Sequence, residues 1–291
     1  MAAEGLATSP HPFDKLRASP EPSRGAVGPP SARLPLILKQ LDRAYGRPAH
    51  ASDGDPLDSL IATVLSQNTS DVNSHRAFAQ LKAKFQSWEE ALAARPSQIA
   101  SAIRLGGLAD IKARRIKQIL RTIEEDRGKL DLSFLRRMKV PEALGYLTAL
   151  PGVGPKTAAC VLLFSLRRPA FPVDTHVLRV SKRLGLIPPN TTMERAHELY
   201  ELMLGDGNPS GQWSAADMLA LHVGLVQHGR RVCIARRPRC GICSIYDLCP
   251  RIGMTPGTAG LPAGRVEGFS LPFHAQEFTQ AEACATRVRT I

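Results

Sequence analysis

Apolar residues recur at intervals of three and four positions through most of residues 34–250, the spacing that places them on one face of a helix. No stretch alternates apolar and polar residues in the manner of a half-buried strand. Proline and glycine mark the ends of many of these segments. The predicted helices cover residues 34–45, 57–65, 72–85, 87–94, 96–103, 111–123, 141–150, 156–166, 174–184, 193–204 and 214–228. The pattern predicts an all-α protein of many short helices, folded as two lobes with a cleft between them.

The two ends of the chain lack this pattern. Residues 1–33 are rich in proline and hold few large apolar side chains, and residues 251–291 combine glycine and proline with scattered apolar positions. Segments of this kind bury too little apolar surface to offset the entropy lost on ordering. We therefore expect a disordered N-terminal tail over 1–33 and a flexible C-terminal tail over 251–291.

The chain is strongly basic, with 38 Lys and Arg residues against 26 Asp and Glu residues and a formal net charge of +12. Such an excess attracts polyanions, of which nucleic acid and an anionic membrane surface are the first candidates. The longest nearly continuous apolar run, residues 158–166, is far shorter than the roughly 20 residues of a membrane-spanning helix. The first residues include acidic side chains and lack the apolar core of a secretory signal. We expect a protein with no membrane partner, located in the cytoplasm and, in a bacterium, on the nucleoid.

The segment LPGVGPKT at residues 150–157 lies between two predicted helices. Gly152 and Gly154 allow backbone conformations closed to other residues and let a phosphate approach the chain. Pro155 suits the first turn of the next helix, whose amides and dipole attract an anion. A helix-helix turn without a ligand has the same composition. The positive charge of the whole chain moves the interpretation towards phosphate binding.

Lys156 follows this hairpin directly, and Asp174 precedes a later predicted helix. An amine attacks only in its neutral form, whereas a nearby carboxylate favours the charged form. Asp174 would therefore act as a base, or stabilise positive charge on a substrate sugar, rather than activate the amine. In the alternative interpretation, Lys156 contacts a phosphate and Asp174 caps a helix. The spacing alone does not separate the two.

Four of the six cysteines lie close together, in the pattern Cys-x6-Cys-x2-Cys-x5-Cys. In a long chain without a secretion signal, this clustering favours a metal centre over a set of disulfides. Zinc usually takes its ligands from two short knuckles and a [4Fe-4S] cluster takes four cysteines, so both remain candidates at this point. The predicted ligands are Cys233, Cys240, Cys243 and Cys249. The residues between the first two ligands that would contact phosphates are Arg236, Arg237 and Arg239.

Taken together, these segments resemble the endonuclease III family of DNA glycosylases, in the helix-hairpin-helix superfamily. The matching segments are PLDSLIATVLSQNTSDV, LPGVGPKTAACVL, VDTHVLRV, LHVGLVQHGRRVC and the four-cysteine loop. The resemblance covers about residues 34–250 and implies a [4Fe-4S] cluster rather than zinc. It also implies a six-helix barrel lobe with the helix-hairpin-helix motif over 57–166, and an iron-sulfur cluster lobe over 34–56 and 167–250.

The resemblance implies a role for each residue around the hairpin. Lys156 would attack C1′ of a damaged nucleotide, expel the base and form a Schiff base, after which elimination cuts the strand. Asp174 would act as a base and support the cation-like sugar. Gly152, Val153 and Gly154 would hold the phosphate beside the lesion through their amides, with the target base turned out of the helix.

Two further side chains would fill the gap left by the extruded base. One is Leu108, an apolar wedge of the kind used by proteins that kink DNA, with a buried core leucine as the alternative. The other is a glutamine in the family; here Asn68 aligns with it and Gln67 stands one residue earlier. His176 would contact phosphate or serve as a packing or capping residue. Pro155 replaces a basic residue common in the family, which removes one phosphate contact.

A basic stripe follows the predicted helix 111–123 and the turn before it. We expect this stripe either to follow a DNA strand or to form a solvated helix face. Its residues are Arg104, Lys112, Arg114, Arg115 and Lys117.

The leading interpretation is a bifunctional DNA glycosylase and abasic-site lyase of base excision repair. We expect it to excise oxidised or damaged pyrimidines, acting as a monomer on double-stranded DNA with damaged bases or abasic sites. A mismatch-specific thymine or uracil glycosylase of the same fold and a non-catalytic iron-sulfur DNA-binding module are the alternatives. Related adenine glycosylases usually lack the lysine and use a glutamate where this chain has Thr63. We therefore do not expect adenine excision.

Overall fold

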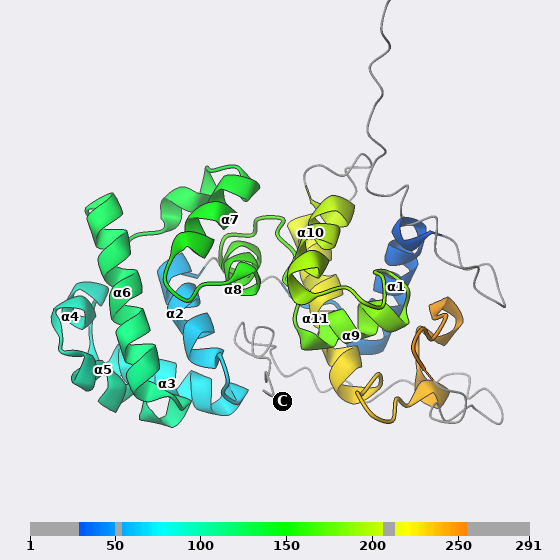
Figure 1. Ribbon diagram of the computed structural model, residues 1–291, viewed down its shortest axis with the longest axis horizontal. Helices are drawn as coiled ribbons and strands as arrows, with labels where there is room; N and C mark the ends of the chain where they lie inside the picture. The colour runs from blue at the N-terminus through cyan, green and yellow to red at the C-terminus, as the bar shows by residue number, and fades with distance from the viewer. Residues whose placement is uncertain (1–28, 50–53, 206–212, 255–291) are drawn as a thin grey trace, which may run out of the picture.

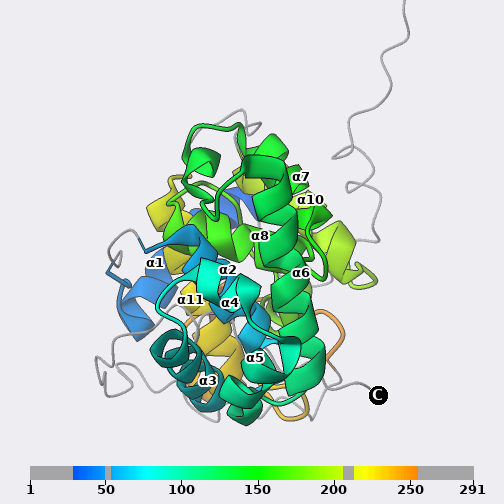
Figure 2. The ribbon, with the colours of Figure 1, turned by 90° about the vertical axis from the view of Figure 1, so that its left-hand side faces the viewer.

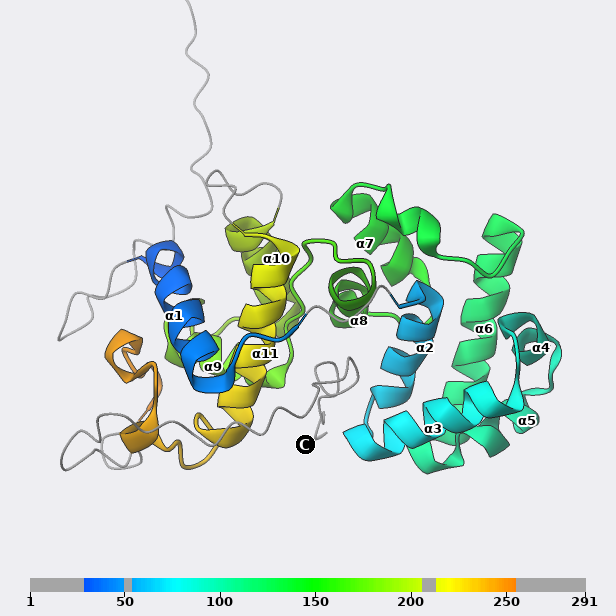
Figure 3. The same ribbon diagram turned by 180° about the vertical axis from the view of Figure 1, so that it is seen from behind.

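The computed structural model describes residues 29–49, 54–205 and 213–254, and every regular element within these ranges is helical, as the sequence predicted. Two groups of helices lie side by side, with α8 between them (Figures 1 and 3). In the described part of the chain, no helix combines the length and the apolar character needed to cross a membrane.

The first lobe is formed by the middle of the chain, and Figure 2 shows its helices from their outer side. Its core contains Leu60, Leu81, Ile116 and Leu147, all fully buried, so four different helices contribute to one apolar interior. The helices are α2 (Pro56–Ser66), α3 (Asp71–Lys84), α4 (Trp88–Ala93), α5 (Pro96–Ala102), α6 (Ala109–Arg127), α7 (Val140–Ala149) and α8 (Pro155–Cys160), with the short turns η2 (Arg104–Gly106) and η3 (Ser133–Arg136).

The second lobe combines the first described helix with the C-terminal part of the described chain. At its centre lies α11, which is buried from Met218 to Gly229 and packs against α1 and α9. The helices are α1 (Pro30–Tyr45), α9 (Thr175–Arg183), α10 (Met193–Leu204) and α11 (Ala215–Arg231), followed by the short turns η5 (Cys240–Ile242) and η6 (Tyr246–Leu248).

The helix that begins at α8 is shared by both lobes. It continues into a π-helical turn, η4 (Val161–Ser165), so the predicted helix over 156–166 is present with a change of winding near its end. Leu162 packs in the core of the first lobe, whereas Leu163 packs in the core of the second. This helix therefore packs against both lobes, and α8 lies between them in Figures 1 and 3.

The predicted limits of the tails are wrong by a few residues at each side. Helix α1 begins at Pro30, and Arg33 is only 6% exposed because its guanidinium donates to the carbonyls of Leu184, Gly185 and Leu248. At the other end, the Ile252 amide donates to a carbonyl at the end of α9. These polar contacts hold both ends of the described chain against the second lobe. The rest of both predicted tails lies outside the described residues.

We predict that Arg33→Ala lowers the free energy of unfolding by roughly 2 to 4 kcal/mol, because three carbonyls lose a charged donor in a buried setting. Urea unfolding followed by circular dichroism measures the change. Arg43→Ala, an exposed arginine on the same helix, is the control. Equal stability of the two variants would contradict the assigned role of Arg33.

Candidate active site and iron-sulfur centre

The glycine hairpin is the turn that joins α7 to α8. Gly152 has a φ of +71°, which favours glycine, and a Cβ at this position would lie 2.1 Å from Nε of Arg115, so a larger residue would also displace that side chain. Val153 is buried and its amide bonds back to the end of α7, while Pro155 begins α8. Within the described part of the chain, the amides of Gly152 and Gly154 donate no backbone hydrogen bond. The Val153 amide, which was predicted to hold a phosphate, is thus engaged within the turn, and the amides of Gly152 and Gly154 are the candidates for an anion.

Arg115 on α6 connects this hairpin to the loop after α2. Its Nη1 donates to Oε1 of Gln67 at 2.7 Å, and Nε2 of Gln67 lies 3.4 Å from both the Gly152 carbonyl and Oγ1 of Thr157. Asn68 is exposed and has a φ of +56°, a conformation that asparagine tolerates better than most residues. Gln67 therefore braces the hairpin, and Asn68 is the amide exposed beside it.

Lys156 lies in the first turn of α8 and is half-buried. Burial lowers the pKa of His197 on α10, and the charge of Lys156 adds to this shift. Helix α10 also contacts α8 directly. Nε2 of His197 accepts the Val173 amide at 3.1 Å, and Nδ1 donates to the Met193 carbonyl at 2.9 Å. Because Val173 precedes Asp174, a neutral His197 holds the segment that carries the carboxylate against α10.

Asp174 is the N-cap of α9 and is only 2% exposed. Its Oδ1 accepts the amide of Val177 at 2.6 Å, so the capping role considered from the sequence is present. A carboxylate has about four acceptor sites, so capping is compatible with a second role. The cap fixes the direction of the carboxylate at the edge of the site.

His176, two residues further, packs against the end of α11. Nη2 of Arg179 lies 3.1 Å from Nδ1 of His176 and 2.8 Å from the Gly229 carbonyl, to which it donates. Burial lowers the pKa of His176, while a hydrogen bond with the backbone of Gly229 raises it. His176 therefore packs between α9 and the end of α11, and the phosphate contact predicted for it stays a prediction.

Leu108, the residue before α6, is 52% exposed and has a φ of +50°, so the alternative of a buried core leucine is wrong.

The basic stripe predicted along α6 and the turn before it is wrong in part. Lys112 is 2% exposed, and Lys117 donates to the carbonyl of Ala94. The remaining positive charge on this helix does not form the continuous surface that was predicted.

The four cysteines line one cavity at the end of the second lobe. Nη1 of Arg183 lies 3.3 Å from Sγ of Cys233, and Nε2 of His228 lies 3.6 Å from Sγ of Cys243. The same arginine donates to the carbonyls of residues 234 and 235, which fixes the start of the loop against α9. The arginines between the first two cysteines, Arg236, Arg237 and Arg239, are all exposed.

The chemistry of this cavity fits a metal cluster. Burial raises the pKa of the Cys243 thiol to about 12 and that of Cys249 to about 11, so thiolates form here only beside compensating positive charge. A [4Fe-4S] cluster is held by four cysteine thiolates, so four cysteines that line one cavity fit it.

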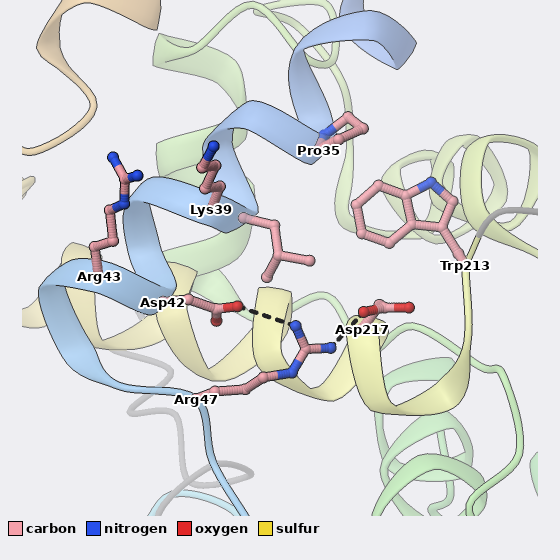
Figure 4. A pocket seen from close by; sticks show the side chains of 8 residues that line it. Pro35, Lys39, Asp42, Arg43, Arg47, Trp213 and Asp217 are labelled. Atoms are coloured by element: carbon pink, nitrogen blue, oxygen red, sulfur yellow. Dashed lines mark hydrogen bonds and ion pairs between the residues drawn. The ribbon is translucent and has the colours of Figure 1, made fainter.

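A separate pocket of about 700 Å³ lies between α1 and the start of α11 (Figure 4). Arg47 bridges Asp42, at 3.0 Å, and Asp217 at its floor, and Trp213 faces it from one side. None of the predicted site residues lines this pocket. It is therefore not part of the constellation around Lys156.

Comparison with known proteins agrees with this geometry. Residues 61–203 match the HhH-GPD superfamily of base excision DNA repair proteins, and residues 233–249 match the iron-sulfur binding domain of endonuclease III. A relative from Arabidopsis thaliana is 50% identical over 132 residues, which make up 45% of each chain. Endonuclease III of Thermotoga maritima is 34% identical over 202 residues, covering 69% of this chain and 86% of the relative. The structure of a non-covalent endonuclease III–DNA complex, 27% identical, superposes with a TM-score of 0.60 over 75% of this chain and 94% of the other.

The fold and the site thus define a helix-hairpin-helix DNA glycosylase of base excision repair, an enzyme that binds DNA. More closely, the chain belongs to the endonuclease III family, and its four-cysteine loop holds a [4Fe-4S] cluster.

Several residues that build the site were not singled out from the sequence. Arg115 was assigned only to a basic stripe, and His197 was not considered, because each acts on a partner far away in the chain. Lys112 carried a signal that was missed: with Ile116, Ile119 and Ile123 it falls on one face of α6, the buried one.

We predict that Cys243→Ala loses most of the iron and the broad absorption near about 400 nm that iron-sulfur thiolate clusters show. Cys160→Ala, which removes a buried cysteine in α8 outside the cluster loop, is the control and keeps both. Iron analysis and absorption spectra of the purified proteins measure the effect. Stoichiometric zinc with no iron in the wild-type protein would overturn the cluster assignment.

Proposed function

We propose that this enzyme is bifunctional: it removes oxidised or ring-damaged pyrimidines from duplex DNA and then cuts the strand through a Schiff base on Lys156. The observation that carries the proposal is the place of Lys156. It stands in the first turn of a helix that begins at an anion-binding hairpin and lies at the junction of the two lobes. Thr63, where related adenine glycosylases use a glutamate, supports a substrate other than adenine.

The proposed chemistry assigns one residue to the attack and another to the charge that it creates. The neutral amine of Lys156 forms a bond to C1′ while the bond from C1′ to the base breaks, and the base leaves with the electron pair and takes up a proton. The buried carboxylate of Asp174 supports the positive charge that develops on the sugar. Opening of the sugar ring gives the Schiff base, and loss of a proton from C2′ then expels the 3′ phosphate.

The loops around the hairpin suit the extrusion of a base. Asn68 and Leu108 are both exposed, on loops that border the hairpin side of the first lobe. Leu108 would enter the base stack as an apolar wedge, and Asn68 would face the orphaned partner base. In this arrangement Gln67 stays with Arg115 and does not probe the base.

We predict that borohydride traps the wild-type protein covalently on a duplex with thymine glycol, and that Lys156→Ala forms no adduct because the attacking amine is gone. The exposed Lys39→Ala is the matched control and traps normally. Trapping by Lys156→Ala, or none by the wild type, would contradict the proposal. Excision of thymine from a G:T pair without excision of thymine glycol would instead assign a mismatch glycosylase, and binding without turnover on every duplex would assign a non-catalytic module.

We predict that Asp174→Asn lowers the rate of base excision by roughly 10²- to 10⁴-fold at unchanged thermal stability, because asparagine caps a helix as well as aspartate but carries no charge. Single-turnover excision and thermal unfolding measure the two effects. Asp174→Ala, which removes both cap and charge, should lose stability as well. An Asn variant that is as active as wild type would leave Asp174 with its capping role alone.

A further inference from the structure

A buried lysine stands behind the loops that border the hairpin. Lys112 lies on α6 and is 2% exposed, and its ammonium makes three hydrogen bonds. Nζ donates to the Leu65 carbonyl at 2.6 Å, to the Gly106 carbonyl at 2.8 Å and to Oγ1 of Thr69 at 3.2 Å. An ammonium has three N–H donors, so these partners use all of them.

The acceptors lie in two separate segments, the end of α2 with the loop after it and the turn before α6. Leu65 is in the last turn of α2, and Thr69 closes the loop that carries Asn68. Gly106 ends η2, two residues before Leu108. The Thr69 hydroxyl also donates to the Gly106 carbonyl, so the two loops are joined directly as well as through the ammonium. Lys112 thus ties both loops to one point.

Both exposed residues on these loops have a left-handed backbone conformation. Asn68 has a φ of +56° and Leu108 a φ of +50°. For a leucine this conformation is unfavourable, and it persists only where the surroundings fix it. The side chain of Leu108 is half-exposed, so its packing does not fix this conformation. The hydrogen bonds of the loop backbone therefore fix it. Gly106 is held from behind by α3, where an added Cβ would lie 3.1 Å from Cβ of Ala77.

We propose that Lys112 is a positioning residue that locks the two loops together, so that Asn68 and Leu108 enter the DNA helix as one rigid pair. This proposal rests on the proposed function, in which these two side chains fill the gap left by the extruded base. Lys112 itself touches neither the DNA nor the reacting atoms.

The chemistry at this position explains why a lysine is present. A buried ammonium is costly, and burial lowers the pKa of Lys112 to about 8, with the charge of Arg115 adding to the shift. An apolar side chain would avoid that cost but would remove this donor from the Leu65 carbonyl and leave the Gly106 carbonyl with the Thr69 hydroxyl alone. The lysine on α6 donates to acceptors in both loops, and this shared donor joins the loops to each other.

The test is Lys112→Met, which keeps the length of the side chain and removes the ammonium. The matched control is Lys117→Met on the same helix, where the ammonium also donates to a backbone carbonyl, that of Ala94, away from these loops. Amide hydrogen exchange without DNA should rise by about tenfold or more in 65–69 and 104–108 together in Lys112→Met, and in neither segment in the control. Faster exchange in one segment only, or in neither, would overturn the proposal.

Kinetics separate positioning from a general structural role. In Lys112→Met, excision of a damaged base from duplex DNA should fall by about tenfold, while borohydride trapping on a preformed abasic site stays within about twofold, since no base must then be displaced. Equal loss of both would contradict the proposal. In a cycle with Leu108→Ala, the double variant should excise no more slowly than the slower single variant; additive losses would contradict coupling through this loop.

Thr69→Val provides a second route if Lys112→Met does not fold. It removes a hydroxyl that joins both loops while Lys112 keeps its two carbonyl partners, and it should raise exchange in both segments to a smaller extent. Unchanged exchange in this variant would contradict the proposal. Absence of base excision by the wild-type protein would refute the proposed function, and the exchange measurements would still decide whether Lys112 locks the loops.

Discussion

The packing of one helix against two apolar cores sets the position of every part of the site. In the run from α8 into η4, Leu162 belongs to the first core and Leu163 to the second, so the helix cannot move with one lobe alone. The glycine hairpin directly precedes this helix, and Lys156 lies in its first turn. The amine and the glycine hairpin therefore keep a fixed place relative to both lobes. In the proposed function, DNA bound across the junction contacts all of them together.

Polar contacts between segments far apart in the chain hold the loops of the site in position. His197 holds the segment before Asp174, Arg115 links Gln67 to the hairpin, and Lys112 joins the loops of Asn68 and Leu108. In each of these contacts, a side chain on a helix binds a residue of a loop elsewhere in the chain. In the second lobe, Arg183 does the same for the start of the cluster loop. In the proposed function, the side chains that fill the gap in the DNA lie on such loops, whereas the attacking amine lies on α8 itself.

The helices and the metal ligands could be predicted from the sequence because their signals are local. Apolar spacing, caps such as Asp174 and the spacing of the four cysteines all lie within a few residues or turns of one another. The supporting contacts could not be predicted in the same way, since Gln67 and Arg115 are 48 positions apart and Val173 and His197 are 24 apart. The proposed role of Asn68 rather than Gln67 rests on contacts of the same kind, because Gln67 binds Arg115 and the hairpin while Asn68 is exposed. The limits of the tails depended on Arg33, whose acceptors are more than 150 positions away.

The central claim is that the amine at the junction of the lobes is the group that bonds to the sugar. Peptide mapping by mass spectrometry, after borohydride reduction of the complex with damaged duplex DNA and protease digestion, tests it most directly. The account predicts a single modified peptide, with the sugar fragment on Nζ of Lys156. A modification on another residue, or on several lysines of the basic surface, would contradict it.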